Sequence, residues 1–366
     1  ISDINFFEID LSFHALNHKP GATHSNLVIM DDSGASVGAS RGAGTNHWAL
    51  GMEECAKRVL EMVRAAKADA GIPEDTPLDS LGLSLSGCEQ ESSNAQLATL
   101  VMERDSTCAK AVYVASDTAG SLYTGAPNGG MVLIAGTGSN ALLRTTDGKQ
   151  YGCGGWGHLL GDEGGAYWIA HKAVKTVIDD ADGLQTCPHS TELVWKEIQE
   201  HFNVDSRMDI ISHAYKDFEK PKFAGLTARL SRLASRGDPL ARSLFHAAGA
   251  VLAAHAIALL RHASGRQRVV CVGSVWKSWS VLKPGVLEEL RRREVTAELE
   301  FVRLRVSSAL GAAWLAAKHV GYDLPRDDSA FCEVFYTYNP TVTVNGNHNG
   351  NGYGNGHDGN GHYDES

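Results

Sequence analysis

Apolar and polar positions in the first third of the chain follow two alternating patterns. Short apolar runs bounded by turn residues predict strands, and apolar residues at helical spacing predict helices. The predicted strands cover residues 26–30, 35–41, 81–86 and 111–116, and the predicted helices cover residues 49–70 and 90–103. Residues 1–25 contain no clear strand leading into their Pro-Gly turn. The repeated strand–helix–strand order predicts an α/β half with parallel strand pairs.

A dense group of glycines follows the next apolar run. Residues 131–135 predict a buried strand, and the sequence Gly-Thr-Gly-Ser-Asn at 136–140 comes directly after it. Asp147-Gly148 between two short runs predicts a hairpin. Residues 152–165 then contain seven glycines in fourteen positions, together with one Trp, one His, one Asp and one Glu. Such a loop brings backbone close to a ligand rather than building a core.

The turn at 136–140 has two interpretations. Its glycines leave backbone N–H groups uncovered, and its Thr and Ser add hydroxyl donors, so it can hold phosphate oxygens. Gly-rich turns also follow strands in many α/β proteins, and the loop at 152–165 is equally typical of a structural Ω-loop. The strand, turn, hairpin and acidic loop all lie within about forty residues, which favours a ligand site.

The second half of the chain is mostly helical and contains two further strands. The predicted helices cover residues 166–180, 191–201, 208–215, 223–235, 239–262, 284–293 and 307–319. The predicted strands cover residues 269–275 and 301–306, and Pro284 stands at a helix start, where proline is tolerated. This pattern predicts two α/β halves with a cleft between them. Because ligands collect at the carboxyl ends of strands in such sheets, we expect Gly87, Asp117 and Gly136 to lie there.

Composition and charge narrow the function classes. The chain has 366 residues, of which 43% are hydrophobic and 21% charged, and its formal net charge is −10. The length predicts two domains, and the negative charge argues against a nucleic-acid partner. No run of eighteen apolar residues is present, so no membrane span is expected. Acidic residues near the start argue against a signal peptide.

The cysteines and the C-terminal residues add two further expectations. The seven cysteines are scattered, without a Cys-x-x-Cys motif or a zinc-ligand spacing, which predicts reduced thiols in a cytoplasmic protein. From Val344 the chain is dominated by Gly, Asn and His and offers no apolar face. A disordered tail is therefore expected, and loose metal binding by its histidines is the weaker alternative.

Several motifs, taken in order, resemble those of the eukaryotic N-acetylglucosamine kinases, which belong to the superfamily of sugar kinases, actin and related ATPases. The resemblance covers about residues 21–340. Its most specific parts lie at 44–48, 83–87, 117–121, 136–140, 152–168 and 271–279. It implies an α/β fold of two actin-like (ribonuclease H-like) domains flanking an interdomain cleft. The implied parts are a small N-terminal domain at 1–127, a large C-terminal domain with a helical insertion at 128–340, and a tail at 341–366.

The resemblance implies a kinase that transfers the γ-phosphoryl group of ATP to the 6-hydroxyl of N-acetylglucosamine, giving N-acetylglucosamine 6-phosphate. ATP is then the cosubstrate, and Mg²⁺ accompanies it. The family resemblance also implies a homodimer. The expected partners are therefore N-acetylglucosamine, ATP and a second copy of the chain, with no nucleic acid and no membrane.

The matching motifs carry over individual site residues. Asp117 is implied as the general base that accepts the proton of the sugar hydroxyl, although an Asp at this place also suits a helix N-cap. The implied sugar-binding residues are Asn46, Asp117, Ser139, Asn140, Gly155, Trp156, Gly157 and Asp162. The implied ATP-binding residues are Thr23, Thr137, Gly138, Ala224, Gly273 and Lys277, and no metal ligands are assigned. Core positions are the alternative for Trp48 and Trp156.

The chain departs from the family at the first phosphate turn, which in the family is a glycine-rich run ending in Gly-Thr after an apolar strand and an acidic residue. The matching residues here are Lys19-Pro20-Gly21-Ala22-Thr23. Pro20 lacks an N–H donor, and Ala22 adds a Cβ atom where phosphate should approach. Three functions therefore stay open: an active N-acetylglucosamine kinase, a catalytically impaired N-acetylglucosamine-binding relative, and a superfamily member acting on a different acyl substrate. The motif at 44–48 and the loop at 152–165 favour a sugar.

Overall fold

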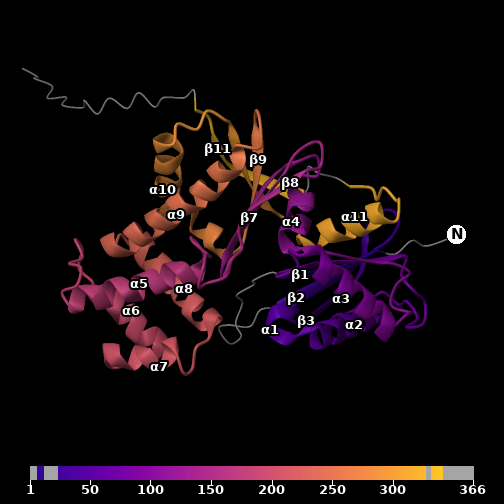
Figure 1. The fold of residues 1–366 in the computed structure, drawn as a ribbon, viewed down its shortest axis with the longest axis horizontal. Helices are drawn as coiled ribbons and strands as arrows, with labels where there is room; N and C mark the ends of the chain where they lie inside the picture. Colours follow the sequence, from indigo (N-terminus) through magenta and orange to yellow (C-terminus); the bar gives the residue numbers. More distant parts are fainter. Residues whose placement is uncertain (1–5, 12–23, 327–330, 341–366) are drawn as a thin grey trace, which may run out of the picture.

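The structure is a computed structural model that describes residues 6–11, 24–326 and 331–340. Two mixed β-sheets form its framework, and helices cover both of them (Figure 1). The predicted first phosphate turn, including Thr23, and the predicted C-terminal tail lie outside the described residues.

The first sheet has five strands in the order β3-β2-β1-β4-β5. These strands are β1 (Phe6–Leu11), β2 (His24–Met30), β3 (Ser36–Ala43), β4 (Ser80–Leu85) and β5 (Val112–Ser116). β1 pairs antiparallel with β2 and parallel with β4, and β4 pairs parallel with β5. The predicted parallel strand pair β4 and β5 is therefore confirmed, and the carboxyl ends of these two strands lie at the same edge of the sheet.

Strand β1 corrects the sequence-based expectation that residues 1–25 contain no clear strand. Residues 6–11 occupy the centre of the first sheet, with ladder hydrogen bonds to β2 on one side and to β4 on the other. Their sequence, FFEIDL, alternates apolar and acidic residues from position 7 to 11, which is a strand pattern that the sequence-based expectation overlooked. Pairing on both sides stabilises this strand, because a central strand satisfies all its backbone donors and acceptors.

Helices α1 (His47–Leu50), α2 (Met52–Asp69), α3 (Glu91–Arg104) and α4 (Asp117–Gly125) follow the strands of the first sheet. The prediction of one helix over 49–70 is confirmed apart from a break at Gly51, whose φ of 82° suits glycine. Apolar side chains of β4 are fully buried against α2 and α3, including Leu81, Leu83 and Leu85. This core fixes the position of the β4 carboxyl end.

The second sheet has six strands in the order β11-β10-β9-β6-β7-β8. These strands are β6 (Gly130–Ala135), β7 (Ser139–Arg144), β8 (Gln150–Gly154), β9 (Gln267–Val272), β10 (Leu299–Leu304) and β11 (Cys332–Tyr338). β7 and β8 pair antiparallel around Asp147-Gly148, so the predicted hairpin is confirmed. β6 pairs parallel with β9, although more than a hundred residues separate the two strands in the sequence.

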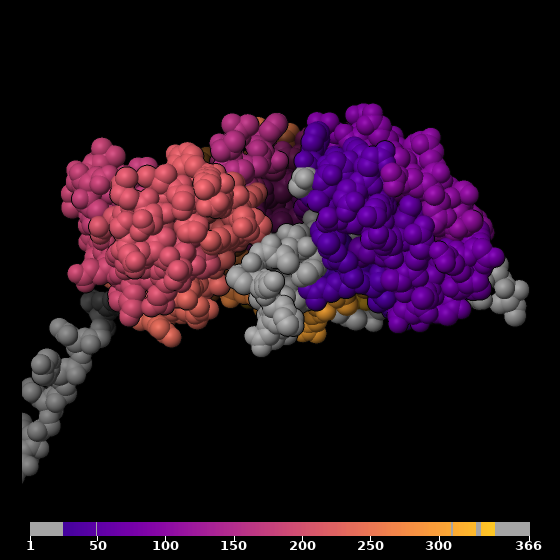
Figure 2. Space-filling model, turned by 90° about the horizontal axis from the view of Figure 1, so that it is seen from below, coloured from indigo at the N-terminus to yellow at the C-terminus, as the bar shows by residue number. Residues whose placement is uncertain are grey.

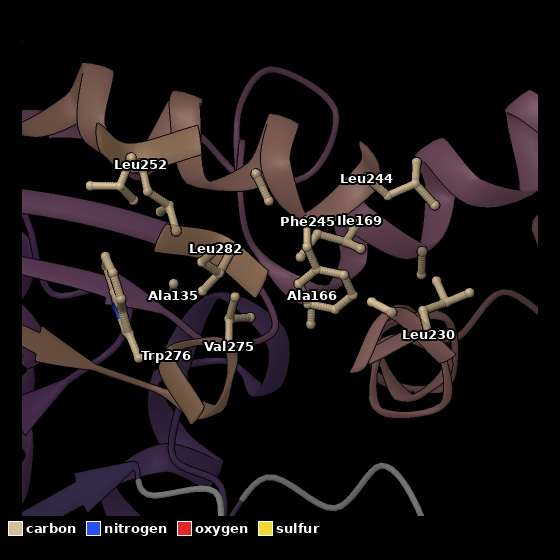
Figure 3. Close-up of a cluster of buried hydrophobic side chains, with 14 of the residues drawn as sticks. Ala135, Ala166, Ile169, Leu230, Leu244, Phe245, Leu252, Val275, Trp276 and Leu282 are labelled. Atoms are coloured by element: carbon tan, nitrogen blue, oxygen red, sulfur yellow. The ribbon is translucent and has the colours of Figure 1, made fainter. Parts of the chain in front are cut away.

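A helical insertion fills the sequence between β8 and β9. Its helices are α5 (Ala166–Ala181), α6 (Glu192–Phe202), α7 (Ile210–Ala214), α8 (Lys220–Ser235) and α9 (Pro239–Leu260), with a 3₁₀ turn η1 (Arg207–Asp209). α5, α8 and α9 pack together and bury Phe245 against Ala166, while Val275 and Trp276 join the same core from the turn after β9 (Figure 3). The core therefore lies directly behind the ends of β6 and β9.

Helix α9 is the one helix of the described residues that is long and apolar enough to cross a membrane by length and composition. The sequence test for a continuous apolar run missed it because isolated polar residues interrupt an alanine-rich segment. Eleven of its residues are buried within the fold. A Cβ atom at Gly249 would lie 2.2 Å from the Leu282 carbonyl oxygen, so α9 packs very closely on the neighbouring helix.

That neighbouring helix, α10 (Trp279–Arg292), starts earlier than predicted. Pro284 lies inside it rather than at its first position, so the expectation of a helix start at Pro284 is wrong. A 3₁₀ segment, η2 (Ser274–Ser278), leads directly into α10, and Trp279 packs against Phe301 and Phe335. Aromatic packing therefore extends the helix by a turn ahead of the proline, at the loss of one helical N–H donor.

Helix α11 (Ala309–His319) crosses back to the first sheet, where it packs against β1, β4 and α4. A division of the chain at residue 127 therefore separates α11 from the sheet that it covers. The division into domains 1–127 and 128–340 stays a prediction, and the packing of α11 on the first sheet does not follow it. In Figure 2 the residues of the first sheet and those of the helical insertion form two lobes with a recess between them.

Candidate active site

Asp117 lies where β5 ends and α4 begins, which is the place predicted for it. Ser116 is the N-cap of α4, and its hydroxyl oxygen accepts a hydrogen bond from the Ala119 amide at 3.3 Å. Asp117 is the first residue of the helix, so the alternative that it serves as the N-cap is wrong. Its carboxylate is free of that task and accepts a hydrogen bond from the Ser86 hydroxyl at 2.5 Å.

The environment of Asp117 suits a proton acceptor. Burial raises the pKa of its carboxyl group above the ordinary value, and hydrogen bonds from the Ser86 hydroxyl and the Thr118 amide offset part of that rise. A general base works best when its pKa approaches the working pH. The sequence predicted Asp117, whereas Ser86 was missed because only folding brings the ends of β4 and β5 together.

The loop before α1 is held against the end of β4. The Asn46 side-chain oxygen caps α1 by accepting from the Trp48 amide at 2.9 Å. The Trp48 indole N–H donates to the Gly87 carbonyl at 2.8 Å, and 64% of the Trp48 surface stays exposed. Gly87 has φ of 91°, and a Cβ atom there would lie 2.5 Å from the Trp48 ring. Glycine at 87 is therefore needed to bring Asn46 and Trp48 close to the Asp117 edge.

The turn after β6 is tied to the start of α5. The Gly136 amide donates to the Gly138 carbonyl at 2.9 Å, which closes the turn. The Gly136 and Thr137 carbonyls accept hydrogen bonds from the amides of Ala166 and Tyr167 at 2.8 and 2.9 Å. The turn therefore sits at the N-terminus of α5, where the helix dipole favours anionic groups.

Asp162 occupies the acidic glycine loop in a left-handed conformation, with φ of 63°. Only 4% of its surface is exposed. Its carboxylate accepts from the Ser139 amide at 3.1 Å and forms an ion pair with Lys220 at 2.6 Å. A Cβ atom at Gly138 would lie 2.2 Å from this carboxylate, which explains the glycine there. Asp162 thus anchors the loop to the turn, and its predicted contact with sugar stays a prediction.

Lys220 was missed at the sequence level because 58 residues separate it from Asp162 and no local pattern links them. It is the first residue of α8, and its ammonium group lies beside the glycine loop. A second anchor comes from Ser139, whose hydroxyl donates to the Glu163 carbonyl at 2.8 Å. The sequence-predicted Ser139 is itself buried.

Asn140 points from the second sheet toward the first. Its side-chain oxygen accepts from the Ala141 amide at 2.9 Å, and its amide nitrogen lies 3.4 Å from a carboxylate oxygen of Glu89. Gly155 packs against it, since a Cβ atom at 155 would lie 2.9 Å from the Asn140 side chain. Glu89 follows β4, so this contact joins the two sheets.

Trp156 and Gly157 lie in the same loop as Gly155. Trp156 is 72% exposed and Trp48 is 64% exposed, so the alternative that these tryptophans are core residues is wrong. Gly157 has φ of 75°, which a glycine adopts without strain. An exposed indole beside polar groups has the chemistry to stack on the apolar face of a sugar ring.

The predicted nucleotide-binding residues of the described part of the chain come from the turn after β6, the segment after β9 and helix α8. Gly273 lies against the end of β6, because a Cβ atom at 273 would be 2.3 Å from the Ala135 carbonyl oxygen. The same Cβ atom would lie 2.8 Å from the Gly136 nitrogen, so the turns after β6 and β9 are adjacent. Lys277 is exposed on η2, and Ala224 is buried within α8.

Helix α8 and the turn after β9 are neighbours, because the hydroxyl groups of Ser231 and Ser278 lie 2.7 Å apart. The structure therefore places the helix that carries Ala224 beside the segment that carries Gly273 and Lys277. Across the described ranges, no group of three or more His, Cys, Asp or Glu side chains is arranged to hold a metal ion.

The chain matches one family model and is similar to several proteins named as sugar kinases. Residues 20–316 match the sequence model of the BadF/BadG/BcrA/BcrD ATPase family. A glucosamine kinase of Vibrio cholerae is 28% identical over 258 residues, which cover 70% of this chain and 82% of that protein. An N-acetyl-D-glucosamine kinase of Dictyostelium discoideum is 24% identical over 315 residues, covering 81% of this chain and 95% of that protein.

Solved structures show the same fold. A putative N-acetylglucosamine kinase from Chromobacterium violaceum superposes with a TM-score of 0.66 at 23% identity, covering 85% of this chain and 99% of that one. A ROK family glucokinase from Streptomyces griseus, solved with glucose and AMPPNP, superposes with a TM-score of 0.53 at 12% identity, covering 87% and 100%. At these identities the likeness establishes the fold, which is the actin-like α/β fold of sugar kinases.

Proposed function

Because the chain belongs to the BadF/BadG/BcrA/BcrD ATPase family, we propose that it is an ATP-dependent kinase that phosphorylates N-acetylglucosamine at the 6-hydroxyl. Relatives named glucosamine kinase and N-acetyl-D-glucosamine kinase support this class of acceptor. The observation that carries the proposal is the grouping around Asp117. A carboxylate with a raised pKa lies at a strand end, and the Asn46 loop and Asn140 reach the same edge.

In the proposed reaction, Asp117 accepts the proton of the sugar 6-hydroxyl as that oxygen attacks the γ-phosphorus of ATP. The new bond joins the sugar oxygen to phosphorus, and the bond from phosphorus to the β–γ bridging oxygen breaks, which releases ADP. Such transfers depend mainly on positioning and charge stabilisation. The adjacent turns after β6 and β9 offer backbone amides for the phosphates, and the exposed Trp156 and Trp48 offer faces for the sugar ring.

Mg²⁺ is proposed to accompany ATP. Mg²⁺ is usually held by substrate phosphates, water and one or two carboxylates, rather than by a cage of protein ligands. The described residues contain no group of three or more His, Cys, Asp or Glu side chains arranged for a metal ion, which suits an ion held mainly by the ATP phosphates and water. When bound, the ion would neutralise charge on the β- and γ-phosphates.

The alternative function is a catalytically impaired sugar-binding relative. The observation that favours it is the sequence Lys19-Pro20-Gly21-Ala22-Thr23, which lies outside the described residues. A coupled assay of ADP release with and without N-acetylglucosamine, run beside a calorimetric sugar titration, separates the two functions. Sugar-dependent ADP release supports the kinase, and sugar binding without ADP release supports the relative. A protein that shows neither sugar binding nor ADP release would refute both functions.

Three narrower points of the proposal need their own measurements. Parallel assays with glucosamine and N-acetylglucosamine decide which acceptor is preferred. Phosphorus NMR of the product decides whether the 6-hydroxyl is the position modified. A homodimer and a cytoplasmic location are also proposed, and analytical ultracentrifugation and cell fractionation test them. All seven cysteines are free, as a location with reducing conditions requires.

A further inference from the structure

The loop between β4 and α3, residues 86–90, contacts two of the proposed substrate-site groups through its first residues. The Ser86 hydroxyl donates to the Asp117 carboxylate at 2.5 Å, and the Gly87 carbonyl accepts from the Trp48 indole at 2.8 Å. The loop is held in shape by its own contacts. The Cys88 amide donates to the Leu85 carbonyl at 3.2 Å, and the Asn94 side chain donates to the Cys88 carbonyl at 2.9 Å.

A third contact of this loop reaches the other sheet. The Asn140 side-chain nitrogen, on β7, lies 3.4 Å from a carboxylate oxygen of Glu89. The orientation of the Asn140 amide is set by its own hydrogen bonds, because its oxygen accepts from the Ala141 amide at 2.9 Å. The nitrogen is therefore turned toward Glu89. One loop thus connects the proposed base, the Asn46–Trp48 segment and the proposed sugar ligand Asn140.

We propose that Glu89 is a positioning residue for phosphoryl transfer, which holds Asn140 across the junction of the two sheets and places a second negative charge beside Asp117. The proposal rests on the proposed kinase function. No sequence motif pointed to Glu89, because its partners lie 28 and 51 positions away along the chain. We infer the role of Glu89 from its contacts in the fold.

Electrostatics agree with this geometry. Burial of the carboxyl group, followed by the charge of Asp117, raises the pKa of Glu89 above its ordinary value, although much of the side-chain surface is exposed. Interaction between like charges is reciprocal, so ionised Glu89 also disfavours ionisation of Asp117. A base whose pKa is raised in this way is a stronger proton acceptor at neutral pH.

The other titratable groups around the loop contribute little charge. The Cys88 sulfur lies 3.8 Å from a ring nitrogen of His47. Burial raises the pKa of Cys88 and lowers the pKa of His47, so both are neutral near pH 7. On the second-sheet side, Asp162 is compensated by Lys220. Among the described residues, neither Asp117 nor Glu89 takes part in an ion pair, so no cation compensates these two carboxylates.

The test compares Glu89→Gln, Glu89→Ala and the control Glu91→Gln. Gln keeps an acceptor oxygen for Asn140 but loses the charge, whereas Ala loses both. Glu91 is exposed at the start of α3 and receives the same substitution outside the contact. Calorimetric titration with N-acetylglucosamine in the absence of ATP should show about fivefold weaker binding for Glu89→Ala, since one hydrogen bond is lost. Glu89→Gln and Glu91→Gln should bind within about twofold of the unsubstituted protein.

The second measurement is the pH profile of kcat/KM. Asp117 must be ionised to accept a proton, and loss of its negative neighbour favours ionisation. The acidic limb should therefore move to lower pH by several tenths of a unit in Glu89→Gln, and stay in place in Glu91→Gln. A merely structural role for Glu89 would not move this limb.

The outcomes separate the two proposals. If the unsubstituted protein shows neither sugar binding nor sugar-dependent ADP release, the kinase function is refuted, whatever the variants do. If the unsubstituted protein does both, but Glu89→Ala binds sugar normally or Glu89→Gln leaves the acidic limb unmoved, the role of Glu89 is refuted. If Glu89→Ala does not fold, the pH profile of Glu89→Gln still decides.

Discussion

Asp117 and Asp162 are both aspartates near strand ends, but their carboxylates meet different groups. Asp162 is buried, accepts from the Ser139 amide and pairs with Lys220, so its hydrogen-bonding capacity serves the loop that contains it. Asp117 accepts from the Ser86 hydroxyl and the Thr118 amide but has no ion pair with any described residue, and burial raises the pKa of its carboxyl group. The first arrangement suits an anchor and the second a proton acceptor.

Asp117→Asn should abolish phosphoryl transfer while it leaves sugar affinity within a few fold. The amide keeps the size of the side chain and its contact with Ser86, but it cannot take a proton at neutral pH. Loss of a general base should lower kcat by about 10² or more. Steady-state kinetics and a sugar titration check both parts, and a variant that keeps a tenth of the rate would exclude Asp117 as the base.

Lys220→Met should destabilise the fold by about 1–3 kcal/mol, because it leaves the Asp162 carboxylate buried without its cation. The matched control is Lys175→Met, which removes a helix-surface ion pair with Asp179 and should cost less than about 0.5 kcal/mol. Urea unfolding at pH 7 measures both free energies. Equal stability of the two variants would show that the Lys220 pair is not an anchor.

Among the loops and secondary-structure elements, the β4–α3 loop owes its conformation to one glycine. Gly87 combines φ of 91° with a close approach to the Trp48 ring, so a side chain there meets both backbone strain and a clash. Gly71 has φ of 69°, and a Cβ atom at 71 would have no neighbouring atom within 4 Å, so this position carries the backbone strain alone. A comparison of substitutions at Gly87 and Gly71 therefore separates the cost of backbone strain from the cost of the clash with Trp48.

Gly87→Ala should therefore cost about 1–3 kcal/mol more in stability than Gly71→Ala, because Trp48 must move away. Displacement of Trp48 would also disturb the Asn46 segment, so sugar affinity should fall in Gly87→Ala and not in Gly71→Ala. Chemical denaturation and sugar titration provide the two readouts. If both variants lose equal stability, the contact between Gly87 and Trp48 does not constrain the loop.

In the molecule as a whole, α11 joins a late segment of the chain to the first sheet. It packs on β1 and β4 and meets α4, the helix that begins with Asp117. A Cβ atom at Gly311 would lie 1.9 Å from the Gly120 carbonyl oxygen and 2.5 Å from the Thr124 hydroxyl. The position of α4, and with it the position of Asp117, therefore depends on residues that come almost two hundred positions later.

Gly311→Ala should separate α11 from α4 and lower stability by about 1–3 kcal/mol, which is typical of overpacking. Gly152→Ala is the control, because the nearest atom to a Cβ at 152 is 4.0 Å away. Melting temperature and kcat should both fall in Gly311→Ala, since Asp117 moves with α4. Unchanged melting temperature would show that the two helices tolerate a wider separation.

Local patterns in the sequence determined much of the framework. The apolar runs that became β4, β5 and β6, the Asp147-Gly148 hairpin and the amphipathic spacing of α2 are properties of neighbouring residues, so they are visible without the fold. The place of Asp117 at a strand end was predictable for the same reason. Its role as a base came from the family resemblance rather than from spacing.

Tertiary structure decided the features that depend on distant partners. β1 lies at the centre of its sheet because β2 and β4 pair with it on either side, and α10 starts ahead of Pro284 because aromatic side chains from later strands pack on Trp279. The pairs Lys220–Asp162 and Glu89–Asn140 join residues more than fifty positions apart. No local pattern encodes such contacts, because they form only when packing of the two sheets brings the strand ends together.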